Sequence, residues 1–186
     1  MNICGHTFDE KKFKDIPIAL DLGGYDGDFA IEFLKQFPFG YVITLEPTPN
    51  LCVSHNGRWI VINKAAWTYD GKTNFFVNDN AHFKNSILIK GGRRTTVETM
   101  DIVPLFKIFY FDIIKVDIEG AEYELIDHLI KTDALRNQKN AQLSIEFHDF
   151  LDHSLLAKTN KTISDLNALG YKAEFYNNNI DVLFSL

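Results

Sequence analysis

The sequence is short of cysteine, and the two cysteines that it has show no pairing pattern. Cys4 and Cys52 are the only ones among 186 residues. A single disulfide would not amount to a stabilising framework, so free thiols in a reducing compartment fit best. We assign neither cysteine as a nucleophile.

Long apolar runs are also missing. The first residues, "MNICGHTFDEKKF", have no apolar core of signal-peptide length. The most apolar stretch, "IVPLFKIFYFDIIKV", is interrupted by Pro104, Lys107, Asp112 and Lys115, which excludes a membrane-spanning helix. We therefore expect a cytoplasmic protein without a membrane partner.

Clustered positive charge is the third absence. The formal net charge is −6, and Arg93-Arg94 is the longest run of basic residues. Nucleic acids and anionic membrane surfaces both require clustered Lys and Arg. We expect neither as a partner.

Short apolar runs alternate with longer amphipathic ones along the chain, which predicts an α/β fold with a mostly parallel sheet. Helices are predicted over 27–37, 120–131 and 155–169, with a further helix beginning at Asp101. Strands are predicted over 16–22, 41–46, 58–67, 73–78, 111–118 and 141–147, and a short strand in "TTVETMDIV" before that helix. The last sixteen residues predict two strands joined by the turn-prone "NNN", so one strand should run antiparallel. No repeat, linker or low-complexity segment occurs, and we predict a single domain over 1–186.

The stretch "ALDLGGYDGDF" joins the first strand of this pattern to the first helix. Its glycines do not have the G-x-G-x-x-G spacing of dinucleotide-binding turns, and no Lys-Ser or Lys-Thr pair follows as in a phosphate-binding P-loop. The carboxylates of Asp21, Asp26 and Asp28 would repel a pyrophosphate. A nicotinamide-dependent oxidoreductase is therefore disfavoured.

A cofactor that carries positive charge and no phosphate fits this turn better. S-adenosylmethionine has a sulfonium and an ammonium group, and Asp21, Gly23 and Gly27 match the D-x-G-x-x-x-G turn of class I methyltransferases. Glu46 follows the second strand, where an acidic residue accepts the ribose hydroxyls. A tight strand-to-helix turn without a ligand is the alternative for the glycines, and Glu46 favours the cofactor site.

The segment "KVDIEGAEYELI" resembles the hallmark of FkbM-type methyltransferases. "LDLGGYDG", "TLEPTPN", "INKAAWTYDGKTNFFV", "VETMD" and "SIEFH" are similar to further segments of that family in the same order, over about 20–148. The resemblance implies a Rossmann-like class I methyltransferase that uses S-adenosylmethionine and methylates hydroxyl groups of sugars or small metabolites. It implies cofactor contacts from Asp21, Gly23, Gly24, Tyr25, Gly27, Glu46, Pro47, Ala65 and Asp117.

Methyl transfer to a hydroxyl needs precise positioning of both partners and a general base. Asp117 and Glu119 lie at the end of the fourth central strand, and Glu146 and His148 lie at the end of the fifth. We expect these four side chains to meet near the methyl group. His148 is the first candidate for the base, because its unperturbed pKa lies near the working pH. Asp117 is the second candidate, or it holds the methionine end of the cofactor.

Purely structural roles remain open for several of these residues. Glu146 and His148 could be a polar pair that closes a strand, and Glu119 and Glu122 could stabilise the start of a helix. Asp, Glu and His also suit a divalent cation. However, no H-x-H or C-x-x-C spacing points to a metal site, and we predict none.

The acceptor site is the least determined part of the sequence. The polar loop 79–95, with His82, Lys84, Asn85 and Arg93-Arg94, is expected to be exposed and could border an acceptor pocket. Only about fifteen residues precede the first strand, too few for a lid, so the pocket would be open, completed by a second copy of the chain, or degenerate. A catalytically inactive binding or partner subunit is therefore the alternative function, and homo-oligomerisation stays open.

Overall fold

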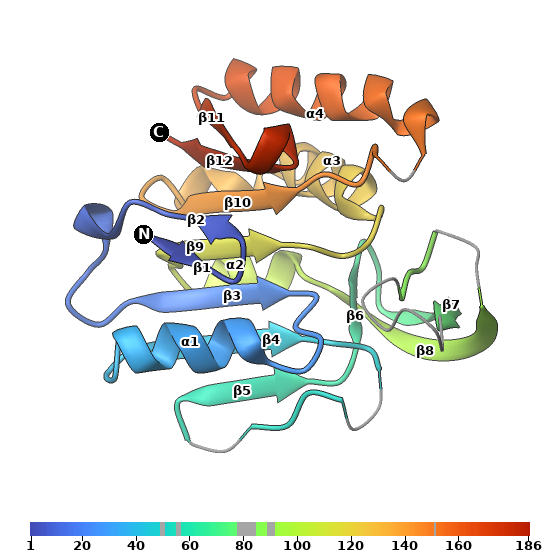
Figure 1. Cartoon of the computed structure of the whole chain (residues 1–186), viewed down its shortest axis with the longest axis horizontal. Helices are drawn as coiled ribbons and strands as arrows, with labels where there is room; N and C mark the ends of the chain where they lie inside the picture. The colour runs from blue at the N-terminus through green and yellow to red at the C-terminus, as the bar shows by residue number, and fades with distance from the viewer. Residues whose placement is uncertain (49–50, 55–56, 78–84, 89–91, 151) are drawn as a thin grey trace.

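A sheet of seven strands lies at the middle of the protein. The computed structural model describes the whole chain except residues 49–50, 55–56, 78–84, 89–91 and 151. In spatial order the strands are β11 (Lys172–Tyr176), β12 (Asp181–Ser185), β10 (Gln142–Glu146), β9 (Ile113–Val116), β3 (Ile18–Leu22), β4 (Tyr41–Leu45) and β5 (Trp59–Ile62). The strands from β10 to β5 are parallel, whereas β12 is antiparallel to both of its neighbours (Figure 1). This confirms the predicted fold class and C-terminal hairpin.

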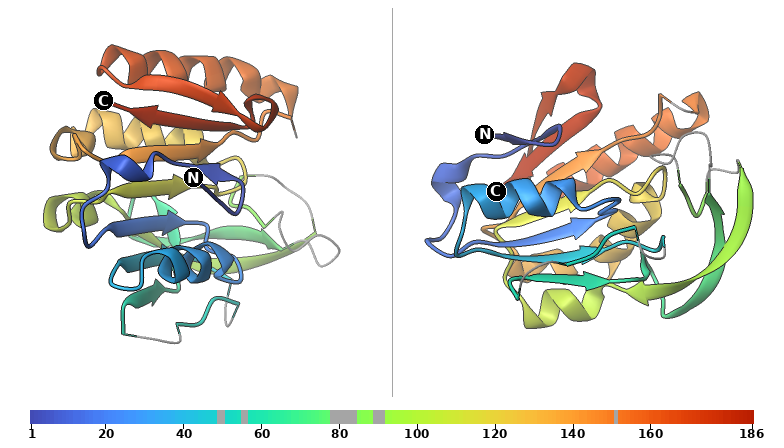
Figure 2. Two further views of the ribbon diagram at one scale, coloured as in Figure 1. Left: turned by 60° about the vertical axis from the view of Figure 1, so that its left-hand side comes forward. Right: turned by 60° about the horizontal axis from the view of Figure 1, so that its bottom comes forward.

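Helices cover both faces of this sheet. Helix α1 (Asp28–Gln36) lies on one face together with the N-terminal hairpin of β1 (Asn2–Ile3) and β2 (His6–Thr7) (Figure 2). Helices α2 (Val103–Ile108), α3 (Glu122–Lys131) and α4 (Leu156–Ala168) pack on the other face. Burial from both sides is the reason why the central strands consist of consecutive apolar residues. Short 3-10 helices lie at Glu10–Lys12, Ala134–Asn137, His153–Leu155 and Asn177–Asn179.

The stretch 58–67, predicted as one strand, forms two strands that belong to different sheets. β5 ends at Ile62, and β6 (Ala65–Trp67) joins β8 (Arg93–Asp101) and β7 (Gly71–Val77) in a three-stranded sheet. Asn63 lies at the break, where its side-chain amide donates to the carbonyl oxygens of Glu46 at 2.8 Å and Thr48 at 3.2 Å. The small sheet lies beyond the carboxyl ends of the central strands (Figure 1).

Two further boundaries differ from the prediction. The loop expected over 79–95 ends earlier, because β8 already begins at Arg93; residues 78–84 and 89–91 lie outside the described residues. The helix expected to begin at Asp101 begins at Val103, whose amide donates to Asp101 Oδ1 at 3.0 Å. Asp101 therefore accepts a hydrogen bond from the first helical amide from the last position of a strand, although the N-cap residue itself is Ile102.

The C-terminal turn is confirmed. Asn177, Asn178 and Asn179 all have positive φ, at 49°, 58° and 69°, a conformation that asparagine tolerates better than most residues. No helix among the described residues is long and apolar enough to cross a membrane.

The two thiols are expected to differ in reactivity. Cys4 is exposed, whereas Cys52 is buried beneath the glycine turn, and burial raises the pKa of Cys52 to about 12. Because only the thiolate reacts, Ellman's reagent should modify one thiol per chain in the native protein and both after denaturation. Cys4→Ser should abolish the native reaction. Rapid labelling of two thiols in the folded protein would contradict the buried position of Cys52.

Candidate cofactor and catalytic site

A pocket opens at the carboxyl ends of β3, β4 and β9, where parallel sheets commonly bind ligands. It spans about 730 Å³, counting the space at its open mouth. The central sheet supplies one wall and the small sheet β6-β8-β7 supplies the other. Its lining consists of Gly23, Tyr25, Leu45, Glu46, Pro47, Ala65, Ala66, Phe75, Asn85, Ile87, Asp117, Ile118, Glu119 and Ala121.

The glycine turn after β3 is held against β9 and β4. The amide of Gly23 donates to the Leu45 carbonyl at 3.0 Å, and Gly23 has a φ of 84°. A Cβ at Gly23 would lie 1.8 Å from the Asp117 carbonyl oxygen, and one at Gly24 would lie 2.0 Å from the Thr44 side chain. These glycines let the turn pack directly on both neighbouring strands, which brings the pocket wall close to Asp117.

Lys115 fixes this turn from beneath. Its fully buried ammonium donates to the Gly23 carbonyl at 2.7 Å and lies 3.1 Å from Asp21 Oδ1 and 3.5 Å from Asp117 Oδ2. Burial would lower the pKa of Lys115, but the two carboxylates raise it above its usual range. Burial would likewise raise the pKa of Asp117, and Lys115 together with His6 holds it well below its usual range. Asp117 is therefore an anion at neutral pH.

Glu46 lies at the pocket wall just after β4. Its Oε2 accepts from the Tyr25 amide at 2.9 Å, and its Oε1 accepts from the Thr48 amide at 2.7 Å. Burial raises the pKa of this carboxyl despite these bonds. Each oxygen keeps a second lone pair, so Glu46 can still accept hydrogen bonds from a ligand.

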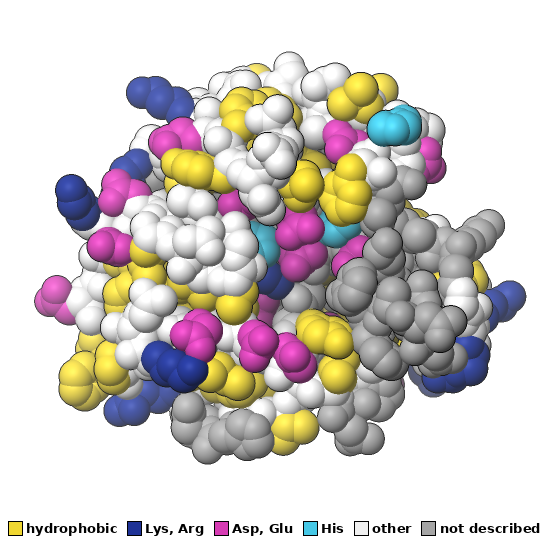
Figure 3. Space-filling view, viewed as in Figure 1, with side chains coloured by type: hydrophobic (Ala, Val, Ile, Leu, Met, Phe, Trp, Pro, Cys, Tyr) yellow, Lys and Arg dark blue, Asp and Glu magenta, His cyan; other side chains and the backbone are white. Residues whose placement is uncertain are grey.

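The four predicted catalytic residues meet in one cluster. His148 Nε2 lies 3.3 Å from Glu119 Oε2 and 3.7 Å from both Asp117 Oδ1 and Glu146 Oε1. Side chains of Asp and Glu gather with those of His at the centre of the face viewed in Figure 3. Asp117 and Glu119 line the pocket. Glu146 and His148 are not among its lining residues and lie beside these two carboxylates.

The position of His148 is set by Glu122, for which the sequence indicated a mostly structural role. Glu122 Oε1 accepts from the amides of Ile118 and Gly120, each at 3.1 Å, and contacts His148 Nδ1 at 2.9 Å. Glu122 therefore bonds the backbone at the start of α3, and the same oxygen also orients the imidazole of His148. Both functions follow from the complete burial of Glu122.

The cluster carries unusual protonation states. Burial would lower the pKa of His148, but Glu122, Glu119 and Asp117 raise it to about 9. Burial raises the pKa of Glu119 to about 8, and burial together with the Asp117 charge raises that of Glu146. In the absence of a ligand, His148 therefore holds a proton at neutral pH, which differs from the unperturbed pKa expected from the sequence. The cluster has more carboxyl groups than cations to pair with them.

The remaining predicted cofactor residues support the pocket from behind. Asp21 is fully buried and reaches the turn through Lys115 and through the Thr44 hydroxyl at 3.1 Å. Gly24 and Gly27 are also absent from the lining, and a Cβ at Gly27 would lie 2.3 Å from the ring of Trp59.

Sequence reasoning missed several residues of the site. Ala66, Phe75, Ile87, Ile118 and Ala121 line the pocket as apolar surface, which no chemical pattern marks. His6 lies 3.8 Å from Asp117 although 110 residues separate the two in the chain, so no local signal could have identified it. Of the predicted acceptor loop, Asn85 lines the pocket; Arg93 and Arg94 are exposed on β8 and are not among the lining residues. His82 and Lys84 lie outside the described residues.

Gly23→Ala is expected to destabilise the fold by about 2–5 kcal/mol, since it adds left-handed backbone strain and a collision with the Asp117 carbonyl. Gly5 has a positive φ of 93°, but a Cβ there would meet no atom within 4 Å. Gly57 has neither a positive φ nor a neighbouring atom within 4 Å of such a Cβ. In urea denaturation Gly5→Ala should therefore cost about 1–2 kcal/mol and Gly57→Ala little. Equal losses for Gly23→Ala and Gly5→Ala would mean that the close approach to Asp117 imposes no constraint.

Lys115→Met is expected to cost about 3–5 kcal/mol in urea denaturation, because it leaves the buried carboxylate of Asp21 without a counter-ion. The double variant Asp21→Asn, Lys115→Met should recover part of that loss. Lys35→Met removes an ion pair with Glu32 at the surface and should change stability little. Losses that simply add in the double variant would contradict a coupled buried pair.

Solved structures share this fold at low sequence identity. Human methyltransferase-like protein 13 in complex with SAH has a TM-score of 0.52 at 11% identity, over 92% of this chain and 72% of that chain. A fibrillarin/Nop5p complex gives 0.54 at 11% identity, over 97% and 75%. Aeropyrum pernix fibrillarin with natively bound S-adenosyl-L-methionine gives 0.53 at 9% identity, over 96% and 69%. These similarities show the class I methyltransferase fold.

The family follows from the sequence itself. No match was found among curated proteins. The profile of the methyltransferase FkbM domain matches residues 21–173, which include the glycine turn, Glu46, Lys115 and the acidic cluster. This chain belongs to the FkbM methyltransferase domain family.

Proposed function

We propose that this protein transfers the methyl group of S-adenosylmethionine to a hydroxyl group of a sugar or small metabolite. The observation that carries the proposal is the pocket that Glu46 and Asp117 line together with Gly23 of the glycine turn. A carboxylate that Lys115 keeps ionised suits a cofactor with ammonium and sulfonium charges. The methyltransferase family and the bound cofactors of the solved relatives support the same cofactor.

In this proposal the cofactor lies along the lining of the pocket. Glu46 accepts the ribose hydroxyls with the lone pairs that Tyr25 and Thr48 leave unused, and Asp117 binds the methionine ammonium. Pro47 and Ala65, which line the same pocket, pack against the apolar part of the cofactor. Gly23 provides backbone without a side chain that would fill the space.

Methyl transfer is an in-line displacement at the methyl carbon, so the acceptor oxygen must approach from the side opposite the sulfonium while its proton is removed. We assign that proton to His148, with Glu119 and Glu146 beside its Nε2. The sulfonium charge would lower the pKa of His148, because a nearby positive charge disfavours protonation. Cofactor binding would thereby convert His148 from an acid to a base.

Calorimetric titration with S-adenosylhomocysteine tests this assignment, with NAD as the control. Binding of S-adenosylhomocysteine and not NAD is expected. Glu46→Gln should weaken that binding by about 1–3 kcal/mol, the usual range for hydrogen bonds to a charged group. Glu98→Gln is the matched control, because Glu98 lies exposed on β8, outside the pocket.

Two outcomes would count against the proposal. Unchanged affinity of a folded Glu46→Gln variant would remove Glu46 from the cofactor site. Failure of the native protein to bind S-adenosylhomocysteine would favour the alternative of a catalytically inactive partner subunit on this fold.

A further inference from the structure

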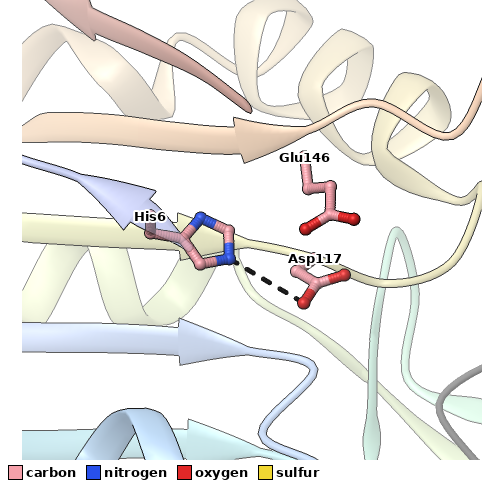
Figure 4. Close-up of side chains that lie close together, drawn as sticks. All are labelled: His6, Asp117 and Glu146. Carbon is pink, nitrogen blue, oxygen red and sulfur yellow. Dashed lines mark ion pairs between the residues drawn. The ribbon is translucent and has the colours of Figure 1, made fainter. Parts of the chain in front are cut away.

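His6 brings a second imidazole to the acidic cluster from the N-terminal hairpin. Its side chain is 1% exposed and points at Asp117 and Glu146, which follow β9 and end β10 (Figure 4). One ligand-type atom from each of these three residues lies within 4.8 Å of the other two. Glu146 and His148 ended the predicted fifth strand, but nothing in the sequence placed His6 beside them.

The hydrogen bonds of β2 and β12 fix the orientation of the His6 ring. Ser144 Oγ donates to Asp181 Oδ1 at 2.6 Å, and Asp181 Oδ2 accepts from the Thr7 amide at 3.0 Å. Since the Ser144 proton is used on Asp181, Ser144 Oγ accepts from His6 Nδ1–H at 2.9 Å. In neutral His6 the lone pair is therefore on Nε2, the nitrogen that faces the carboxylates.

That nitrogen has no hydrogen-bond partner among the described residues. Its nearest carboxylate oxygen, Asp117 Oδ2, is 3.8 Å away, which is too far for a hydrogen bond. A buried nitrogen aimed at carboxylates is unfavourable unless a cation, either a proton or a metal ion, lies between them. The separation of 3.8 Å between His6 Nε2 and Asp117 Oδ2 leaves room for a metal ion.

His148 repeats this arrangement on the other side of Asp117. Its Nδ1 contacts Glu122 Oε1 at 2.9 Å, and its Nε2 lies 3.7 Å from Asp117 Oδ1. Histidines that bind metals commonly donate the other ring N–H to a carboxylate, a carbonyl or water, which holds the ring in place. Both imidazoles of the cluster are oriented in this manner by groups outside it.

We propose that His6, Asp117 and Glu146 form a binding site for a divalent transition-metal ion. One imidazole and two carboxylates are a mixed nitrogen and oxygen donor set, which favours ions such as Mn²⁺ or Zn²⁺ over Mg²⁺. Donor atoms around such an ion are about 3 Å apart, so the side chains need to move inward only slightly.

The ion would lie at the edge of the pocket, because Asp117 belongs to both sites. The side chains of Asp117 and Glu146 are 27% and 29% exposed, which leaves access from solvent and room for a further ligand. Metal binding itself does not depend on the proposed function. Only a role of the ion in orienting the acceptor oxygen rests on it.

Titration of the full chain with Mn²⁺, followed by the electron paramagnetic resonance signal of the free ion, tests the site. One Mn²⁺ should bind per chain, and Zn²⁺ should displace it. His6→Gln and Glu146→Gln should each weaken binding at least about 10-fold, as expected when a ligand is lost. His153→Gln is the matched control, because His153 is exposed in the 3-10 helix His153–Leu155, and it should bind like the native protein.

The proposal is overturned if the native protein binds neither Mn²⁺ nor Zn²⁺, in which case the protonated forms of His6 and His148 supply the positive charge that faces the carboxylates. It is also overturned if Glu146→Gln and His6→Gln both keep native affinity while circular dichroism shows that they are folded. Glu146 is partly exposed, so its variant keeps the test meaningful even if His6→Gln fails to fold. A parallel titration with S-adenosylhomocysteine reports on the proposed function separately, since neither His6 nor Glu146 lines the cofactor pocket.

Discussion

The site depends on the buried ammonium group of Lys115. A lysine without solvent contact is tolerated only where carboxylates and carbonyls surround it, and Asp21 and Asp117 supply those carboxylates from adjacent strands. The same ammonium donates to the Gly23 carbonyl. Lys115 therefore holds the glycine turn and the anionic Asp117 at the end of β9 in one arrangement before any ligand binds. Such preorganisation lowers the cost of positioning a cofactor.

The carboxyl groups of the acidic cluster next to Lys115 differ in their protonation. Burial and mutual repulsion favour the neutral forms of Glu119 and Glu146, while Asp117 stays ionised. Two histidines, each oriented from outside the cluster, face this acidic group. The cluster has more carboxyl groups than cations. A sulfonium ion would balance this charge on the pocket side, and a metal ion would balance it on the side of the N-terminal hairpin. In this way one carboxylate, Asp117, would connect cofactor binding with acceptor activation.

Much of this organisation could be predicted from local patterns. Consecutive apolar residues indicated the central strands, and the "NNN" turn indicated the antiparallel hairpin. The prediction of one strand over 58–67 was wrong because its composition suits a strand throughout, whereas the structure divides it at Asn63, whose side-chain amide bonds to the backbone after β4. The pKa of His148 could not be predicted either, since it depends on Glu122, Glu119 and Asp117, which surround it in space.

The sequence by itself determined the α/β fold, the family and the four chemical groups at the strand ends, because strand and turn signals and the order of motifs are local properties. The tertiary structure decided the rest. It buried Asp21 behind the turn rather than in the pocket, folded β6, β7 and β8 into the opposite wall, and brought His6 to Asp117. These outcomes depend on contacts between segments far apart in the chain, and such contacts leave no pattern in the residues around any one of them.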